Sequence, residues 1–153
     1  MTQRFCGTCT ACCKTHPVKE IRKAPNQWCR HCAKGRGCRI YDTRPSGCRE
    51  FQCQWLKSGW APDERPDKTR IVVDCVEYPG VGQVVLVFEL IRGDLQGSFA
   101  RIVRDRALSR GMSLMTIPVT PKFPATLYTH VRLPSDSNFA LDDGREIKVV
   151  YLG

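Results

Sequence analysis

The sequence lacks several features that would assign it to a protein class directly. It has no apolar run long enough to cross a bilayer, and it does not begin with a basic segment, an apolar stretch and a cleavage site of small residues. We therefore expect a soluble, cytoplasmic protein with no membrane partner. Repeats, low-complexity tracts, a glycine-rich phosphate loop and a Ser/His/Asp arrangement are also missing, so we expect a non-enzymatic role.

Acidic residues are scarce in the first 60 positions. Twelve Lys and Arg residues stand there against three Asp and Glu, a net charge of +9, whereas residues 61–153 carry twelve of each sign. Such an excess suits a nucleic-acid surface, but it also suits the compensation of metal-bound thiolates, which are negatively charged. We favour compensation. We therefore expect no nucleic-acid partner, and any protein partner is unidentified.

Cysteine, by contrast, is abundant and concentrated at one end of the chain. Nine of the ten cysteines lie within the first 53 residues, beginning with "FCGTCTACC" at Phe5–Cys13. Because the cytosol keeps ordinary thiols reduced, this density indicates metal binding sooner than a disulfide framework. The candidate ligands are Cys6, Cys9, Cys12, Cys13, Cys29, Cys32, Cys38, Cys48 and Cys53.

The spacing of these cysteines predicts zinc sites. Cys6/Cys9 and Cys29/Cys32 are two C-x2-C turns separated by nineteen residues, a spacing typical of one tetrahedral zinc ion. A second set of four would come from the other cysteines, namely Cys38, Cys48 and Cys53 with Cys12 or Cys13. We predict one or two Zn²⁺ ions, each in a site of four cysteines, with a structural role or a carrier and interaction role.

An iron-sulfur cluster is the alternative. Cys6-x2-Cys9-x2-Cys12 is also the beginning of a ferredoxin-like ligand run, which a distant cysteine such as Cys48 would complete. A 4Fe-4S protein would have a redox or enzyme-accessory role. Two features favour zinc: Cys13 follows Cys12 directly, and no second ferredoxin-type run follows.

The same segment resembles a known family. "FCGTCTACC" followed by "C...GCRIYDTRPSGCREFQC" is similar to the bacterial YkgJ-type cysteine-cluster family, whose pattern is C-x2-C-x2-C-C and then C-x-I-Y-x-x-R-P-x-x-C-R-x-F ending in cysteine. The similarity covers residues 5–53 and implies a zinc- or iron-chelating domain. The chelating positions would be Cys6, Cys9, Cys12, Cys13, Cys38, Cys48 and Cys53, and the framework positions Tyr41, Arg44, Pro45, Arg49 and Phe51.

The resemblance has limits in both activity and pattern. Some relatives, including the flagellin lysine methylases, are linked to iron-sulfur chemistry, but only the cysteine segment is shared, so their activity does not transfer. Thr10 stands where glycine is frequent, and Cys32 lies where an apolar residue often follows Cys29. The added Cys32 makes a second complete set of four thiols possible.

Three residues beside the cysteines are expected to support the ligands: Arg44, Arg49 and Tyr41. A guanidinium can donate hydrogen bonds to a thiolate and so keep it deprotonated. Alternatively, Arg44 and Arg49 pair with Asp42 and Glu50 as ordinary loop arginines. An apolar cap over the metal lobe is expected from Tyr41, Phe51 and Trp55.

Beyond residue 58 the pattern becomes that of an ordinary α+β fold. The loop "PGV" joins two β-branched runs into a hairpin, and residues 94–111 are predicted to form the one main helix, with Asp94 as its N-cap and Gly111 as its end. Strands are expected within 69–78, 82–91, 113–120, 125–133 and 145–152. We predict a metal-stapled, loop-rich cysteine lobe at 1–58 packed on a mostly antiparallel sheet at 59–153, together one compact domain.

Overall fold

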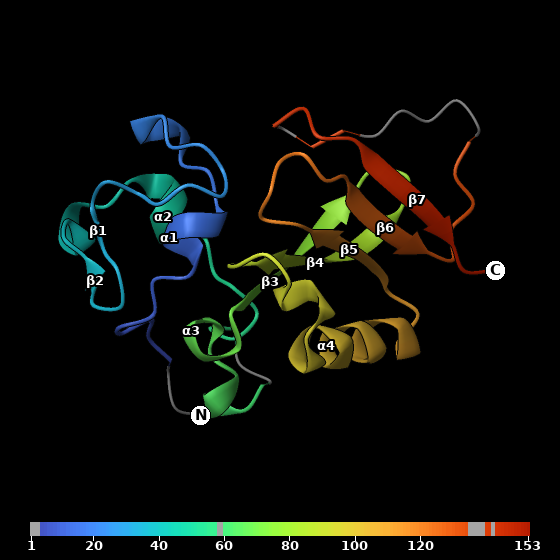
Figure 1. The fold of residues 1–153 in the computed structure, drawn as a ribbon, viewed down its shortest axis with the longest axis horizontal. Helices are drawn as coiled ribbons and strands as arrows, with labels where there is room; N and C mark the ends of the chain where they lie inside the picture. Colours follow the sequence, from blue (N-terminus) through green and yellow to red (C-terminus); the bar gives the residue numbers. More distant parts are fainter. Residues whose placement is uncertain (1–3, 58–59, 135–139, 142) are drawn as a thin grey trace.

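The computed structural model describes residues 4–57, 60–134, 140–141 and 143–153, and its main element is a five-stranded sheet. The predicted α+β class is confirmed (Figure 1). The strands are neighbours in chain order: β3 (Ile71–Tyr78), β4 (Gly82–Glu89), β5 (Ser113–Ile117), β6 (Ala125–Thr129) and β7 (Ile147–Tyr151).

The sheet is mixed, so the prediction of a mostly antiparallel sheet is wrong. β3 pairs with β4 and β5 with β6 in antiparallel fashion, whereas β4/β5 and β6/β7 are parallel pairs. The hairpin predicted at "PGV" is confirmed, with Tyr78 opposite Gly82. A parallel pair needs a long connection, and the chain supplies one through the helix before β5 and another through residues 130–146. The residue pattern of a strand does not reveal whether the strand pairs with its neighbour in parallel or antiparallel fashion.

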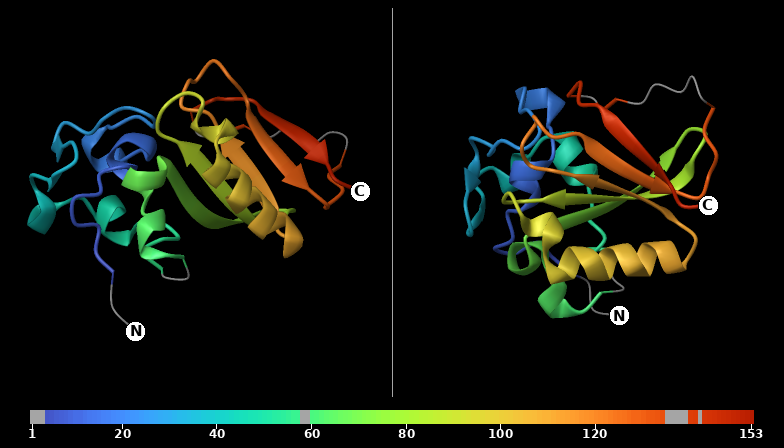
Figure 2. Two further views of the ribbon diagram at one scale, coloured as in Figure 1. Left: turned by 60° about the horizontal axis from the view of Figure 1, so that its bottom comes forward. Right: turned by 45° about the vertical axis from the view of Figure 1, so that its right-hand side comes forward.

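The main helix, α4 (Ser98–Ser109), covers one face of the sheet (Figure 2). Its Ala100, Val103 and Ala107 are buried against strand residues such as Val87 and Leu114. Residues 94–96 form a separate 3-10 turn, η4 (Asp94–Gln96), so Asp94 does not cap α4; it pairs with Arg70 instead. No helix in the described ranges is long and apolar enough to cross a membrane.

The N-terminal part, residues 4–57, has little regular structure, and we call it the lobe. None of its helices or strands exceeds five residues. They are α1 (Cys12–Thr15), η1 (Lys19–Ile21), β1 (Cys32–Ala33), β2 (Gly37–Cys38), η2 (Tyr41–Thr43) and α2 (Ser46–Glu50). Two short elements, η3 (Pro62–Glu64) and α3 (Pro66–Thr69), then lead into β3. The boundary predicted between residues 58 and 59 lies outside the described residues.

The lobe is not an independent unit, because it shares a buried cluster with the sheet. Ala11, Cys53 and Trp55 pack on Val72 of β3, with Phe88 of β4 partly buried beside them. Hydrogen bonds add further links: the Gln54 backbone N–H donates to the carbonyl of Val73 at 2.8 Å, and the Lys14 side-chain ammonium donates to that of Leu90 at 2.5 Å. The lobe therefore rests on the end of the β3–β4 hairpin opposite its turn.

Candidate metal centre

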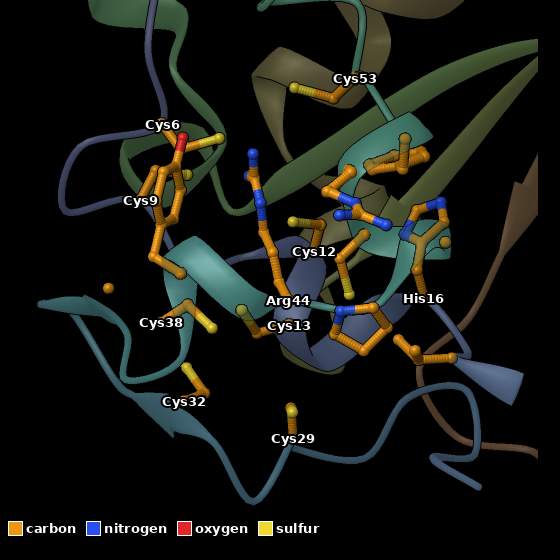
Figure 3. Close-up of a pocket in the computed structure, with 18 of the residues that line it drawn as sticks. Cys6, Cys9, Cys12, Cys13, His16, Cys29, Cys32, Cys38, Arg44 and Cys53 are labelled. Carbon is orange, nitrogen blue, oxygen red and sulfur yellow. The ribbon is translucent and has the colours of Figure 1, made fainter. Parts of the chain in front are cut away.

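All nine cysteines predicted as ligands line one cavity in the lobe, of about 520 Å³ (Figure 3). They come from the N-terminal loop and α1, from the β1–β2 region, from α2 and from the chain just after it. The cavity is also lined by basic side chains, while no Asp or Glu in the described ranges contributes to its wall. Its cationic residues are Arg4, Lys23, Arg44 and Arg49. The cavity wall thus combines nine thiols with four positive charges, and burial, with smaller contributions from the nearby carboxylates of Asp67 and Glu20, raises the pKa values of Cys9 and Cys48.

Two tight turns present the C-x2-C pairs. The Cys9 N–H donates to the Cys6 carbonyl at 2.8 Å, and the Cys32 N–H donates to the Cys29 carbonyl at 3.1 Å. Gly7 has a φ of +56° in the first turn, a left-handed conformation that glycine adopts without a steric penalty. Both turns therefore have the local geometry that brings two sulfurs to the same side.

The first group of thiols, which we call the Cys53 set, consists of Cys6, Cys9 and Cys53. Cys9 and Cys53 belong to the same apolar cluster, and Cys6 is held to Cys9 by their shared turn. Burial and the nearby thiols of Cys53, Cys9 and Cys13 together raise the pKa of Cys6 to about 11, and the Arg44 charge acts in the opposite direction. These three thiols are therefore neighbours next to one guanidinium.

The second group, the Cys13 set, gathers around α1 and the β1–β2 pair. The Cys29 N–H donates to the Cys13 carbonyl at 3.0 Å, and Cys32 lies opposite Cys38 across the two strands. Two main causes raise the pKa of the Cys13 thiol: a hydrogen bond with Cys12, which is the larger cause, and burial. Burial also raises the pKa of Cys48, with further contributions from thiols of this set. The members of the Cys13 set are Cys12, Cys13, Cys29, Cys32, Cys38 and Cys48.

The spacing predicts that both C-x2-C turns hold one metal ion, and this pairing stays a prediction. Cys53 leaves α2 toward the sheet and packs in the same apolar cluster as Cys9. The Cys13 thiol also contributes to raising the pKa of Cys6, so the two groups of thiols share the one cavity.

The thiols surround a space and do not converge on a point. Within the part of the chain that the structure describes, no three Cys, His, Asp or Glu side chains are placed to hold a metal ion. The donor chemistry nevertheless suits a thiophilic metal, since nine sulfurs face one cavity with cations in its wall. Binding a single tetrahedral ion would draw sulfurs together, whereas a cluster would hold them farther apart through its own atoms.

Lys23 is a cavity residue that the sequence analysis missed. Its ammonium donates to the carbonyls of Lys14 at 2.9 Å and Ala24 at 3.1 Å, and also to that of His16. Burial lowers the pKa of Lys23, and ionised thiols of the Cys13 set act in the opposite direction. Lys23 thus sets a fixed positive charge beside Cys12, Cys13, Cys29 and Cys48. As one of twelve basic residues in the first 60, it gave no signal of its own.

The three predicted supporting residues lie in different surroundings. The Arg44 guanidinium carbon sits 3.9 Å from the Tyr41 ring centroid, and its buried Nε has no hydrogen-bond partner among the described residues. Arg49 lines the cavity but is exposed. No ion pair within the described ranges joins Arg44 to Asp42 or Arg49 to Glu50.

The predicted apolar cap holds only in part. Trp55 is buried and Phe51 is half-buried, but the Tyr41 side chain is 46% exposed. Tyr41 therefore stacks on Arg44 at the outer edge of the cavity and does not close the apolar cluster.

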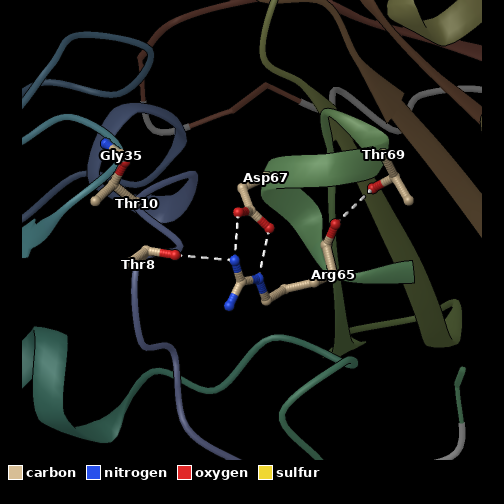
Figure 4. Close-up of polar contacts among 6 residues, drawn as sticks. All are labelled: Thr8, Thr10, Gly35, Arg65, Asp67 and Thr69. Carbon is tan, nitrogen blue, oxygen red and sulfur yellow. Dashed lines mark hydrogen bonds and ion pairs between the residues drawn. The ribbon is translucent and has the colours of Figure 1, made fainter. Parts of the chain in front are cut away.

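Arg65 fixes the loop that carries Cys6 and Cys9 (Figure 4). Its guanidinium binds both carboxylate oxygens of Asp67 at 2.6 Å and donates to the Thr8 hydroxyl at 3.0 Å. Thr10, where glycine is frequent in the resembling family, accepts a hydrogen bond from the Gly35 N–H at 3.0 Å. The first C-x2-C loop is thus tied to α3, and the start of α1 to the β1–β2 turn.

His16 packs its ring between Phe51 and Phe88, at centroid distances of 4.0 and 4.6 Å. Its Nδ1 lies 2.7 Å from the Thr15 hydroxyl, and its buried Nε2 has no partner in the described structure. Burial lowers the pKa of His16 from 6.5 to about 3, and the charge of Lys23 acts in the same direction. The ring is therefore neutral in the folded protein at pH 7.

This shift predicts an acid-sensitive step in stability. Below pH 6.5 His16 of the unfolded chain binds a proton, whereas in the folded chain it stays neutral down to a pH of about 3. Its contribution to the free energy of unfolding is therefore complete above pH 6.5 and falls as the pH decreases. The slope should be at most about 1.4 kcal/mol per pH unit. Stability measured by urea unfolding should fall more steeply between pH 7.5 and 4.5 in the wild type than in His16→Phe, where only metal release and the carboxylates contribute. Parallel curves for the two proteins would contradict the assignment.

Comparisons with protein-family models, with curated proteins and with solved structures found no match to this chain. The structure itself defines an α+β protein with a five-stranded mixed sheet and a cysteine-lined cavity in its lobe.

Proposed function

We propose that this protein binds metal through thiolates of the lobe, as a cytoplasmic protein of the YkgJ-type cysteine-cluster kind. The observation that carries the proposal is the single cavity lined by nine cysteines and four cationic residues. Cations gathered around one cavity favour nearby negative charge, and the burial-raised pKa values of several thiols leave those thiols neutral in the absence of metal. Metal binding removes the thiol protons and supplies that negative charge.

Zinc in a structural or carrier role is the first form of the proposal. Four thiols of the Cys13 set would hold one ion, and the Cys53 set would contribute to a second. Bound zinc supplies cross-links and no redox chemistry. The lobe has little regular structure and only a small shared core, so such cross-links would contribute directly to its folding. An unidentified protein would then recognise the ordered lobe.

An iron-sulfur cluster is the second form, and one observation favours it specifically. The nine sulfurs line a space of about 520 Å³, without three donors of the described residues around one point. A 4Fe-4S cluster spaces its cysteine ligands farther apart than a single ion does, because iron and sulfide lie between them. The protein would then have a redox or enzyme-accessory role.

Nucleic acid is the less favoured partner for the basic lobe. Four of the positive side chains face the cysteine cavity, where phosphates of a duplex would compete with thiolates for them. Nucleic-acid binding by charge needs such groups free at the surface and weakens steeply with salt. The basic excess is better accounted for by the thiolates.

Metal and sulfide analysis of protein purified without oxygen tests the proposal and separates its two forms. A colourless sample with one or two zinc ions per chain supports the first form. A brown sample with iron and acid-labile sulfide in similar amounts supports the second. Protein that carries neither metal, and binds neither when reconstituted under reducing conditions, would contradict both.

A further inference from the structure

An open groove lies between α4 and the part of the sheet that the helix does not cover. α4 packs on β4 and β5, and β7 lies beyond the helix in both views of Figure 2. The groove has a volume of about 410 Å³, and its wall includes Arg101 and Arg104 of α4, Thr116 of β5, and Thr126 and Tyr128 of β6. All of its lining residues that the structure describes lie outside the lobe, so the groove is separate from the cysteine cavity.

Two arginines give the groove positive charge that no carboxylate in its wall neutralises. Arg101 and Arg104 are three residues apart on α4, so their side chains leave the same side of the helix. Although Asp105 is on the same helix, neither arginine forms an ion pair within the described ranges, and no Asp or Glu in those ranges lines the groove. The Arg104 guanidinium carbon lies 4.9 Å from the Tyr128 ring centroid, and this stacking leaves the N–H groups at the guanidinium edge able to donate. Both guanidinium groups can therefore donate to one ligand.

The sheet side of the groove adds hydroxyl groups. Thr116 of β5 lies directly opposite Thr126 of β6, and Leu114 lies opposite Tyr128. Because alternate residues of a strand face the same side, and Leu114 packs under α4, both threonines face the helix. Their hydroxyls form no hydrogen bond within the part of the chain that the structure describes. A ligand in the groove would therefore meet hydrogen-bond donors from both α4 and the sheet.

We propose that this groove binds the phosphate group of a small phosphorylated organic molecule. A phosphate monoester carries a charge of about −1.5 to −2 at pH 7 and three acceptor oxygens, which matches two guanidinium groups and two threonine hydroxyls. A carboxylate has one charge and two oxygens and would leave donors of the groove unused. The groove volume lies in the range of small-molecule sites, and the apolar Leu95 and Pro118 in its wall are available to the organic part of the ligand.

Amide chemical shifts of the full, isotope-labelled chain test this site, with glycerol phosphate as the probe at constant ionic strength. Glycerol phosphate should shift amides of α4, β5 and β6 beside the groove and leave those of residues 5–53 unchanged, whereas glycerol alone should shift neither. Arg104→Gln should weaken binding by about tenfold or more, because a charge-assisted hydrogen bond is lost. Arg110→Gln is the matched control, since Arg110 is exposed at the end of α4 outside the groove wall, and it should leave the affinity unchanged.

A second variant tests the sheet side of the groove. Thr126→Val keeps the shape of the side chain without its hydroxyl and should weaken binding by about three- to tenfold, while the amide spectrum reports that the chain stays folded. A titration that shifts no amide beside the groove, or an affinity that Arg104→Gln and Thr126→Val both leave unchanged, overturns the inference. Shifts confined to the lobe, or tighter binding of a single-stranded oligonucleotide along α4, also overturn it. Metal content is measured separately, so each of these failures leaves the proposed metal-binding function standing.

Discussion

Removal of the metal is expected to unfold the lobe while most of the sheet stays folded. The lobe has no helix or strand longer than five residues, and its apolar contacts are limited to the cluster shared with Val72 and Phe88. The sheet has two further clusters of its own, one under α4 and one on the opposite face. Metal binding contributes folding free energy to small sites of this kind, so its loss should fall on the lobe.

Hydrogen exchange before and after chelation measures this effect. Amides in residues 5–53 should exchange about 100-fold faster or more once the metal is removed, whereas amides of β4, β5 and β6 should keep most of their protection. The β3 amides, which lie beside the lobe, should show an intermediate change. Reloading the metal provides the control and should restore protection. Equal loss across residues 71–151 would show that lobe and sheet unfold as one cooperative unit.

Replacing Lys23 by methionine is expected to lower metal affinity by about 10- to 100-fold. The ammonium lies beside four thiols of the Cys13 set and is fixed there by three carbonyls. Without its charge, forming thiolates in a buried cavity becomes more costly, and the metal competes less well with protons. Methionine keeps much of the side-chain volume, so the change acts mainly on charge.

Competition with a chromogenic chelator at fixed pH measures this affinity. Lys19→Met is the matched control, since Lys19 is exposed on η1 and does not line the cavity. Its affinity should equal that of the wild type. Hydrogen exchange of the metal-loaded variants separates a charge effect from a loss of fold. An unchanged affinity in Lys23→Met, with the lobe folded, would remove Lys23 from the account of the site.

Local patterns in the sequence were sufficient to predict much of the fold. The two β-branched runs and the "PGV" turn between them predicted β3 and β4, and the apolar spacing predicted a helix that includes α4. Strand directions were not predictable, because they depend on how the connections cross the sheet. The N-cap prediction at Asp94 failed because residues 94–96 form their own 3-10 turn and the extended Gly97 lies between that turn and α4.

The membership of the cavity could be predicted, but not its organisation. Crowded cysteines with few apolar neighbours indicated metal ligands, and all nine line one cavity. The packing of Cys53 and Cys9 in one apolar cluster was not predictable, because the two residues are 44 positions apart and no spacing rule relates them. Lys23 and His16 were missed because a lysine or histidine acquires its role from burial, which only the folded chain defines.

Thiol labelling of anaerobically purified protein tests the central claim, that the cysteines of the lobe hold metal, most directly. Cys75 lies on β3 outside the cavity wall and serves as an internal reference. Before chelation, iodoacetamide should label Cys75 and leave most of the nine lobe cysteines unmodified, as read by mass spectrometry of peptides. After chelation under reducing conditions the lobe cysteines should be labelled rapidly, with Cys75 unchanged. Lobe cysteines that react at the same rate before and after chelation would contradict the account.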